Sequence, residues 1–388
     1  MINRDIFGNM DLKLNEIYLS GYKSIGDEQR IPINDDVTVL LGANGVGKSN
    51  IISFFHMLGY AITGSLQYYV AEHGFANTFL HYGSKQTPSL SAKLVFSDKS
   101  SRDEYFFRLT HAAGDVLIYT EETLKILQDT KKYKKPFTIT MDVGRKESQL
   151  IEQSGKDKPF KNMVQFVLSL LKGCQYFQFH DTSLKSEIKQ HTHVANNRSL
   201  RSDAGNLSAF LYGIKTKRDG KPYYERIVRY IRQVFPQFDD FVMLPTVQND
   251  NYVNLDWREK GNDNVFGAHQ ISDGTLRFMA LSTLLLQPEN TLPPIIVLDE
   301  PELGLHPTAI DILAGMVKKA SVHSQIIVAT QSPRLIDAFA AEKIVVVERD
   351  NKDKSSVFKK LDEEALKDWL GNYTTSELWD KNIIGGRP

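Results

Sequence analysis

The glycine-rich loop GANGVGKS at residues 42–49 constrains the fold of this chain more than any other stretch. It fits the spacing G-x-x-x-x-G-K-[ST], with one further glycine, Gly45, between the fixed positions. A loop of this kind follows a strand and precedes a helix, because its backbone N–H groups and the helix N-terminus face one anion together. The apolar run VTVLL (37–41) predicts the strand, and SNIISFFHMLGY (49–60), apolar at helical spacing, predicts the helix.

This loop predicts a site for the phosphates of a nucleotide. In such a site Lys48 reaches the β- and γ-phosphates, and the Ser49 hydroxyl holds Mg²⁺. The residues predicted to contact ATP here are Gly42, Ala43, Asn44, Gly45, Val46, Gly47, Lys48, Ser49 and Asn50. The alternative is a structural glycine turn with an exposed lysine, so a second element of the same machinery has to be found further along the chain.

A pair of acidic residues supplies that second element. In PPIIVLDEPELGLHP (293–307), four apolar residues predict a buried strand that ends in Asp299 and Glu300. Ligands bind at the carboxyl edge of parallel sheets, where both carboxylates would then lie. We expect Asp299 to hold Mg²⁺ through water and Glu300 to orient and deprotonate the attacking water. The alternative is an ordinary strand and polar turn, but two acids beside a core strand are costly without a purpose.

A third motif lies between the first two. In HQISDGTLRFMALSTLLL (269–286), Ser272 and Gly274 stand at the start of an apolar-periodic helix. A serine and a glycine at a helix N-terminus form an anion-binding site. Because the first loop already supplies a full set of phosphate contacts, we expect this site to cap the γ-phosphate held by another subunit. The alternative is a plain helix cap.

The order GANGVGKS, SDGTLR, IIVLDEPELGLHP, ATQSP resembles the ABC-type ATPase heads of the SMC and RecF group. It is more similar still to the ATPase domain of overcoming-lysogenisation-defect (OLD) family proteins. FHDTS (179–183), DAGNLSAFLY (203–212) and the closing GGRP point to its stand-alone bacterial subgroup, which lacks the Toprim nuclease domain. The resemblance implies an AAA family ATPase with an α/β P-loop NTPase fold of ABC-ATPase head type. Such a head has a mixed β-sheet nucleotide lobe, an antiparallel β subdomain and an inserted helical lobe.

The resemblance also assigns roles to residues. It implies that 42–49 is the Walker A loop and that Asp299 and Glu300 are the Walker B pair. Ser272 and Gly274 match the ABC signature, and Leu303 to His306 lie where the D-loop falls. Two such heads dimerise head-to-tail in these proteins, with two ATP molecules sandwiched between them.

Two further positions follow from the same resemblance. Gln331, after the predicted strand QIIVAT, occupies the place of the switch histidine in many ABC heads. A glutamine can hydrogen-bond a γ-phosphate but cannot become a charged imidazolium, so we expect slow hydrolysis. The Q-loop residue, a further metal-side ligand, is either Gln178 or His180 at the end of another predicted strand. The alternative for both is a strand side chain packed against its neighbour.

The expected organisation has three parts. Residues 1–180 form the nucleotide-binding lobe with Walker A and a β-rich subdomain, whose short apolar runs within 90–150 predict antiparallel strands. Residues 181–268 form a helical lobe. Residues 269–388 carry the signature helix, Walker B, the D-loop, the switch region and a C-terminal tail.

Composition narrows the class of protein. Lysine plus arginine equals aspartate plus glutamate, 47 of each, which argues against a general nucleic-acid coat protein. Two short basic runs, 131–135 and 215–221, could touch phosphate backbones, although solvated loop charge is the simpler interpretation. A single cysteine, Cys174, fits a reducing compartment. With no secretory signal and no apolar run of membrane-spanning length, we expect a cytoplasmic protein without a membrane partner.

The function expected from these observations is hydrolysis of ATP with Mg²⁺ by a homodimer, with higher oligomers allowed. The catalytic residues would be Lys48, Glu300 and Gln331. Too few residues follow the last predicted strand, 343–349, for a Toprim nuclease domain. We therefore expect a separately encoded effector, with a nuclease-like protein as one candidate, in a bacterial anti-phage defence or toxin-like system. The alternatives are a RecF- or SMC-like DNA-repair ATPase that binds DNA, and a slowly hydrolysing nucleotide-dependent scaffold.

Overall fold

The computed structural model describes residues 12–98, 101–128, 137–155, 161–246 and 249–387. A six-stranded central sheet has the order β18-β17-β3-β16-β15-β8, in which only the β17–β18 pair is antiparallel. The strands are β3 (Val37–Leu41), β8 (Cys174–Phe177), β15 (Ile295–Asp299), β16 (Gln325–Thr330), β17 (Ile344–Arg349) and β18 (Ser356–Lys360). Every residue of β3, β15 and β16 is buried, as expected of parallel strands covered on both faces.

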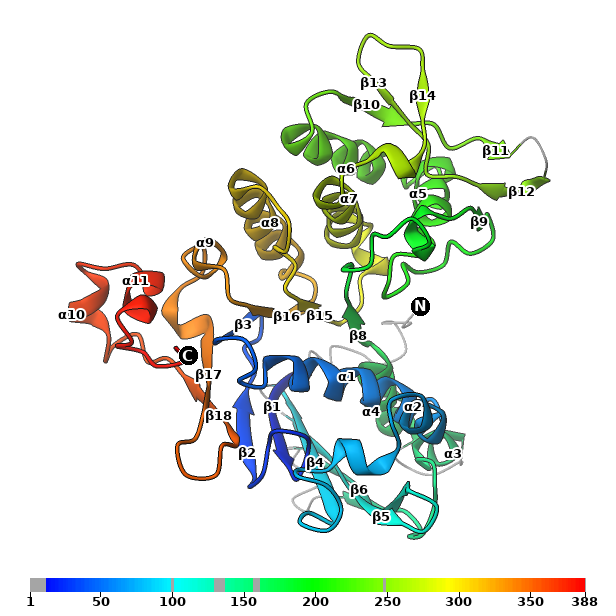
Figure 1. Cartoon of the computed structure of the whole chain (residues 1–388). Helices are drawn as coiled ribbons and strands as arrows, with labels where there is room; N and C mark the ends of the chain where they lie inside the picture. The colour runs from blue at the N-terminus through cyan, green and yellow to red at the C-terminus, as the bar shows by residue number, and fades with distance from the viewer. Residues whose placement is uncertain (1–11, 99–100, 129–136, 156–160, 247–248, 388) are drawn as a thin grey trace.

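Helices cover the two faces of this sheet (Figure 1). On one face lies α1, which packs with a second sheet into one core; on the other face lie α7 and α8 in a separate core. Successive residues of β3 alternate between the two cores, with Val39 in one and Leu40 in the other. The helices on the second face are α7 (Asp273–Leu286), α8 (Pro307–Ala320) and α9 (Pro333–Ile336), opposite α1 (Lys48–Ile62).

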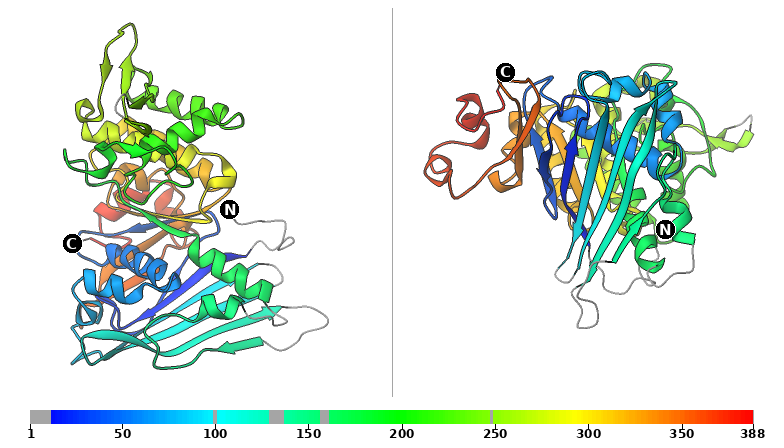
Figure 2. Two further views of the ribbon diagram at one scale, coloured as in Figure 1. Left: turned by 90° about the vertical axis from the view of Figure 1, so that its right-hand side faces the viewer. Right: turned by 90° about the horizontal axis from the view of Figure 1, so that it is seen from below.

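The second sheet is antiparallel and has the order β2-β1-β4-β5-β6-β7. Its long strands spread out below α1 in the right-hand view of Figure 2. The antiparallel strands expected within 90–150 are confirmed by β4 to β7. The strands are β1 (Lys13–Ser20), β2 (Gln29–Pro32), β4 (Ser89–Ser97), β5 (Ser101–Ala112), β6 (Val116–Gln128) and β7 (Phe137–Thr140). Three helices accompany this sheet: α2 (Leu66–Glu72), α3 (Leu150–Gly155) and α4 (Lys161–Lys172).

In its described residues, 181–246 and 249–268, the lobe expected to be helical contains two α-helices and two small three-stranded sheets, β10-β13-β14 and β11-β12-β9. Strands of two to five residues leave too short a pattern to stand out from loops in the sequence. The helices are α5 (Leu207–Thr216) and α6 (Lys221–Val234); the strands are β9 (Thr192–His193), β10 (Phe238–Phe241), β11 (Pro245–Thr246), β12 (Asn249–Val253), β13 (Trp257–Glu259) and β14 (Val265–Phe266). Two short helices, α10 (Lys367–Leu370) and α11 (Thr375–Asp380), follow the central sheet.

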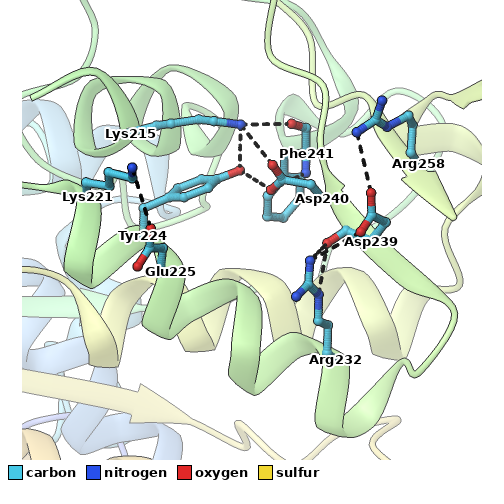
Figure 3. A network of polar contacts seen from close by, with 9 residues as sticks. All are labelled: Lys215, Lys221, Tyr224, Glu225, Arg232, Asp239, Asp240, Phe241 and Arg258. Atoms are coloured by element: carbon cyan, nitrogen blue, oxygen red, sulfur yellow. Dashed lines mark hydrogen bonds and ion pairs between the residues drawn. The ribbon is translucent and has the colours of Figure 1, made fainter. Parts of the chain in front are cut away.

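A polar network fixes α5 and α6 against β10 in this lobe (Figure 3). The Lys215 ammonium donates to the Tyr224 hydroxyl at 3.2 Å and to Asp240 at 3.1 Å, and the Tyr224 hydroxyl donates to Asp240 at 2.6 Å. Lys221 pairs with Glu225 at 3.9 Å. Two cations of the basic run 215–221 are thus engaged within the lobe, and the other basic run lies outside the described residues.

The central sheet draws its strands from both ends of the chain, so the first and last of the three expected parts fold around one sheet. The three-part division itself stays a proposal. Among the residues described, no helix combines the length and the apolar character that crossing a bilayer requires.

One buried side chain joins the two large sheets and gives a test of the fold. The Gln325 amide accepts from Leu14 N at 2.8 Å and donates to Leu14 O at 2.8 Å and to Asn34 O at 3.0 Å. Gln325→Ala would leave buried backbone groups unpaired, and we expect a loss on the order of 3 kcal/mol in the free energy of unfolding, measured by urea denaturation. The control is Gln190→Ala, an exposed glutamine whose loss should change stability by less than about 0.5 kcal/mol. Equal effects of both changes would contradict the structural role of Gln325.

Candidate nucleotide-binding site

The glycine-rich loop leaves β3 at Gly42 and enters α1 at Lys48. Gly47 has a φ of 116°, and a Cβ there would lie 2.1 Å from the Ser356 Oγ. A Cβ on Gly42 would lie 2.4 Å from the carbonyl oxygen of Val347. Only glycine fits at either position, because both approach the neighbouring strands β17 and β18 too closely for a side chain.

The Lys48 side chain lies back across this loop. It is 4% exposed, and its ammonium donates to the carbonyl oxygens of Gly42 at 2.6 Å and Ala43 at 2.9 Å. Burial lowers the pKa of Lys48, and the carboxylates of Glu300 and Asp299 oppose this shift. The ammonium is therefore bonded to loop carbonyls, and phosphate oxygens can replace these carbonyls as its partners.

Asp299 ends β15 as a buried carboxylate that is 9% exposed. Burial raises the pKa of Asp299. Its Oδ1 has no hydrogen-bond partner in the part of the chain that the structure describes. A buried acceptor left unpaired costs about 1–3 kcal/mol, so this atom marks a place where a ligand completes the site. Carboxylate and hydroxyl oxygens are ligand types that suit Mg²⁺, so Asp299 and Ser49 carry the chemistry that this ion would need.

Glu300 takes a left-handed backbone conformation directly after β15. Its φ is +40°, which is rare for a residue with a side chain, and its N–H donates to the carbonyl of Ala329 at 2.8 Å. Such a conformation costs about 1–3 kcal/mol and is found where neighbouring contacts enforce it, often at functional sites. The turn places Glu300 at the carboxyl edge of the sheet beside Asp299.

Both candidates for the Q-loop residue lie against Asp299. The Gln178 amide donates to Asp299 Oδ2 at 3.4 Å and bonds His180 Nδ1 at 3.0 Å. His180 Nε2 bonds the backbone oxygen of Asp299 at 3.1 Å. Of the two, Gln178 contacts the carboxylate of Asp299, whereas His180 contacts its backbone oxygen.

The signature motif forms the N-terminus of α7. The Ser272 Oγ accepts from Thr275 N at 3.3 Å, so Ser272 caps the helix, and its side chain is exposed. A Cβ on Gly274 would lie 2.3 Å from the carbonyl oxygen of Gly304. At this helix end, Ser272 is therefore exposed, while the backbone of Gly274 packs directly against the expected D-loop.

Arg277, also on α7, is a site residue that the sequence analysis missed. Its guanidinium donates to Phe179 O at 3.1 Å, His180 O at 2.9 Å and Leu303 O at 3.1 Å. It joins the signature helix to the end of β8 and to the D-loop. The arginine was visible in SDGTLR, but its partners lie about a hundred residues upstream and 26 residues downstream.

A second group of missed residues supports the outer side of the glycine-rich loop. The Arg349 guanidinium donates to Gly45 O at 3.1 and 2.9 Å, and the Ser356 hydroxyl donates to Val46 O at 2.5 Å. The carbonyl of Gly386 accepts from Ala43 N at 3.0 Å. Carbonyls and one N–H of the loop are thus bound by residues from the last part of the chain. The sequence showed GGRP as a family feature but gave no sign of this contact.

The sequence profile described as "AAA domain, putative AbiEii toxin, Type IV TA system" matches residues 37–337. No curated protein sequence matches significantly. An SMC head structure bound to the C-terminal winged-helix domain of ScpA is similar, with 17% identity over 91% of this chain and 99% of that one and a TM-score of 0.56. An SMC head with an extended coiled coil, bound to the C-terminal domain of ScpA from Pyrococcus furiosus, has 16% identity over 93% and 99%, and a TM-score of 0.53. These likenesses confirm the expected α/β P-loop fold of ABC-ATPase head type.

The support from Arg349 can be tested directly. Arg349→Ala would free the carbonyl of Gly45 and loosen the loop, so we expect the dissociation constant for Mg²⁺–ATP to rise about fivefold to tenfold, as calorimetry would measure. Arg30→Ala serves as the matched control, because Arg30 bonds Glu16 on the antiparallel sheet. An unchanged affinity in Arg349→Ala would show that the loop holds its shape without this side chain.

Proposed function

The chain belongs to the family of AAA domains described as AbiEii toxin-type, Type IV TA system, and we propose that it is an ATPase that binds ATP at the loop 42–49. One observation carries the proposal. The charges of Asp299 and Glu300 act on the buried Lys48 ammonium, and both acids lie at an edge of the sheet where the Glu300 backbone is strained and Asp299 Oδ1 has no partner among the described residues. A phosphate-binding cation and two carboxylates at one sheet edge are what hydrolysis of a nucleotide requires.

Each residue then has a defined part in the reaction. Lys48 exchanges its loop carbonyls for the β- and γ-phosphate oxygens. Ser49 and Asp299, with Gln178 beside them, would hold Mg²⁺, which would supply positive charge against the phosphates. Glu300 orients the attacking water and accepts its proton. Gln331 follows β16, the strand between β3 and β15, from where its side-chain amide can donate to the γ-phosphate.

The second part of the proposal is a head-to-tail homodimer around two ATP molecules. Ser272 caps an exposed helix N-terminus, and an uncovered helix end of this kind suits an anion. Among the described residues of its own chain, the hydroxyl bonds only Thr275, three residues further along. We infer that Ser272 and Gly274 complete the site of a partner subunit. The resemblance of the motifs to ABC-type heads supports this arrangement, and higher oligomers are compatible with it.

The biological role we propose is control of a separately encoded effector, for which a nuclease-like protein is one candidate, in a cytoplasmic bacterial defence or toxin-like system. The family description, which names a toxin–antitoxin system, supports this role. The similar SMC heads are bound to a domain of another protein, ScpA, which supports a partner protein for this head as well.

Two other functions are each favoured by one observation. The resemblance of the motifs to the SMC and RecF group favours a DNA-repair ATPase, for which salt-sensitive DNA binding coupled to ATP would be the evidence. Gln331 in place of a histidine favours a nucleotide-dependent scaffold that barely hydrolyses. Copurification of the chain with the products of neighbouring genes, with and without ATP, separates these functions from control of an effector.

The proposed base can be tested by Glu300→Gln. The change keeps the shape of the side chain but removes the proton acceptor, so ATP should bind and stay, and the dimer should accumulate in size-exclusion chromatography. Turnover should fall at least about a hundredfold. Glu363→Gln, a change on an exposed glutamate, is the control. If Glu300→Gln hydrolyses ATP at the parental rate, another group is the base.

The composite site can be tested with Ser272→Arg. The added cation and bulk would block closure over phosphate while leaving the loop 42–49 intact, so the variant should bind ATP as a monomer and not turn over. Lys48→Ala should fail for the opposite reason, by losing ATP. Mixing the two inactive proteins gives heterodimers with one site that carries both changes and one that carries neither, so some activity should return.

Ser199→Arg, at an exposed serine of the inserted lobe, is the control for bulk and charge and should remain active. A Ser272→Arg protein that hydrolyses ATP normally, at a rate per molecule independent of its concentration, would show that Ser272 is only a helix cap. The head-to-tail dimer would then be rejected.

A further inference from the structure

A second buried carboxylate, that of Glu302, follows Asp299 and Glu300 closely in sequence. Glu302 is 8% exposed and follows the turn at Glu300. Its carboxylate accepts a hydrogen bond from the Thr330 hydroxyl and also interacts with the backbone N–H of Gln331, while its Oε2 makes no hydrogen bond of full geometry among the residues described. A buried carboxylate is costly unless neighbouring groups hold it. Neither the family motifs nor the proposed reaction steps assign Glu302 a part.

Thr330 connects this carboxylate to the segment that carries Gln331. Thr330 is the last residue of β16 and is fully buried. Because an ionised carboxylate can only accept, the Thr330 hydroxyl donates to Glu302, and its lone pairs remain free to accept from Ser332 N at 2.9 Å. The chain of bonds Ser332–Thr330–Glu302 therefore spans Gln331 and fixes the backbone on both sides of it.

Both ends of this chain of hydrogen bonds are themselves bonded to neighbouring segments. Glu302 is rigidly placed, because its own backbone oxygen accepts from Leu305 N at 3.0 Å in the D-loop. On the other side, Ser332 caps α9 by accepting from Leu335 N at 3.4 Å. Gln331 thus belongs to a short segment whose backbone is held on both sides, so less backbone entropy remains to be lost when this segment meets a phosphate.

We propose that Glu302 is a positioning residue for hydrolysis: through Thr330 it fixes the backbone of Gln331 so that the glutamine amide donates to the γ-phosphate. The inference rests on the ATPase function proposed above. It assigns Glu302 a hydrogen-bonding role rather than a proton-accepting one. Because a glutamine in place of a switch histidine carries no charge that attracts it to the γ-phosphate, the fixed backbone orients its amide toward the phosphate instead.

The test is a double-mutant cycle measured by steady-state ATP hydrolysis. Thr330→Val keeps the shape of the side chain but removes the hydroxyl, and we expect kcat to fall about tenfold with less than a twofold change in KM for ATP. Thr330→Ser retains the hydroxyl and should restore at least half of the parental kcat. Gln331→Ala should be at least as slow as Thr330→Val. The double variant should be no slower than Gln331→Ala alone, because both changes act through one side chain.

Glu302→Gln separates position from charge. Its amide oxygen can still accept from Thr330, so kcat should stay within about threefold of the parental value and its pH profile should keep the same shape. A loss as large as that of Thr330→Val would overturn the inference, because the negative charge would then be what matters. Multiplicative effects of Thr330→Val and Gln331→Ala would overturn it as well.

Two measurements keep the outcome interpretable. Calorimetric ATP affinity confirms that each variant folds; if Thr330→Val does not fold, Thr330→Ala takes its place in the cycle. A parental protein without measurable ATPase activity would contradict the proposed function itself. An active parental protein whose Thr330 variants are unimpaired would overturn only the role of Glu302.

Discussion

The parallel register of β3, β16 and β15 is the constraint on which the site depends. Leu41 pairs with Thr330, and Ala329 pairs with Asp299, so the three strands end within about one residue of each other. The glycine-rich loop, the segment of Gln331 and the turn at Glu300 therefore leave the sheet at one level. The glycine-rich loop lies far upstream of the other two segments, and α8 separates Glu300 from Gln331. No local feature would bring the three segments together without this pairing. The inserted lobe lies between β8 and β15 in sequence, so it does not change the register of the strands in the central sheet.

That edge of the sheet is built at a cost in stability. Lys48, Asp299 and Glu302 are buried polar groups, two of which leave an oxygen without a partner among the described residues, and Glu300 adopts a strained backbone. A core optimised for stability alone would replace such groups by apolar side chains. Their retention in one small region is physically reasonable when a charged ligand completes the missing contacts. The same groups would then favour the bound state over the free one, since binding relieves the cost.

Much of the fold and of the candidate site could be predicted from local patterns. The loop at 42–49, the strand before it and the acids after β15 each have a signature within about fifteen residues, because a phosphate loop and a buried parallel strand dictate their own neighbours. The supporting residues could not be predicted. Arg349, Gly386 and Arg277 act through backbone carbonyls or amides of distant segments, and any residue type can offer a carbonyl. The contacts that shape the site therefore leave almost no compositional trace.

Arg277 shows how these non-local contacts unify the site. It binds the backbone that leaves β8, where Gln178 and His180 contact Asp299, and it binds the D-loop at Leu303. Gly274, one turn earlier on the same helix, touches Gly304. The N-terminus of α7 is thus bonded to both segments that flank Asp299. Helix α7 also packs against α6 of the inserted lobe. If the backbone after β8 or the D-loop shifts, the bonds of Arg277 must therefore break, or α7 and the lobe must move as well. The exposed end of α7 and the buried acid of β15 are therefore mechanically one unit, although they belong to different motifs.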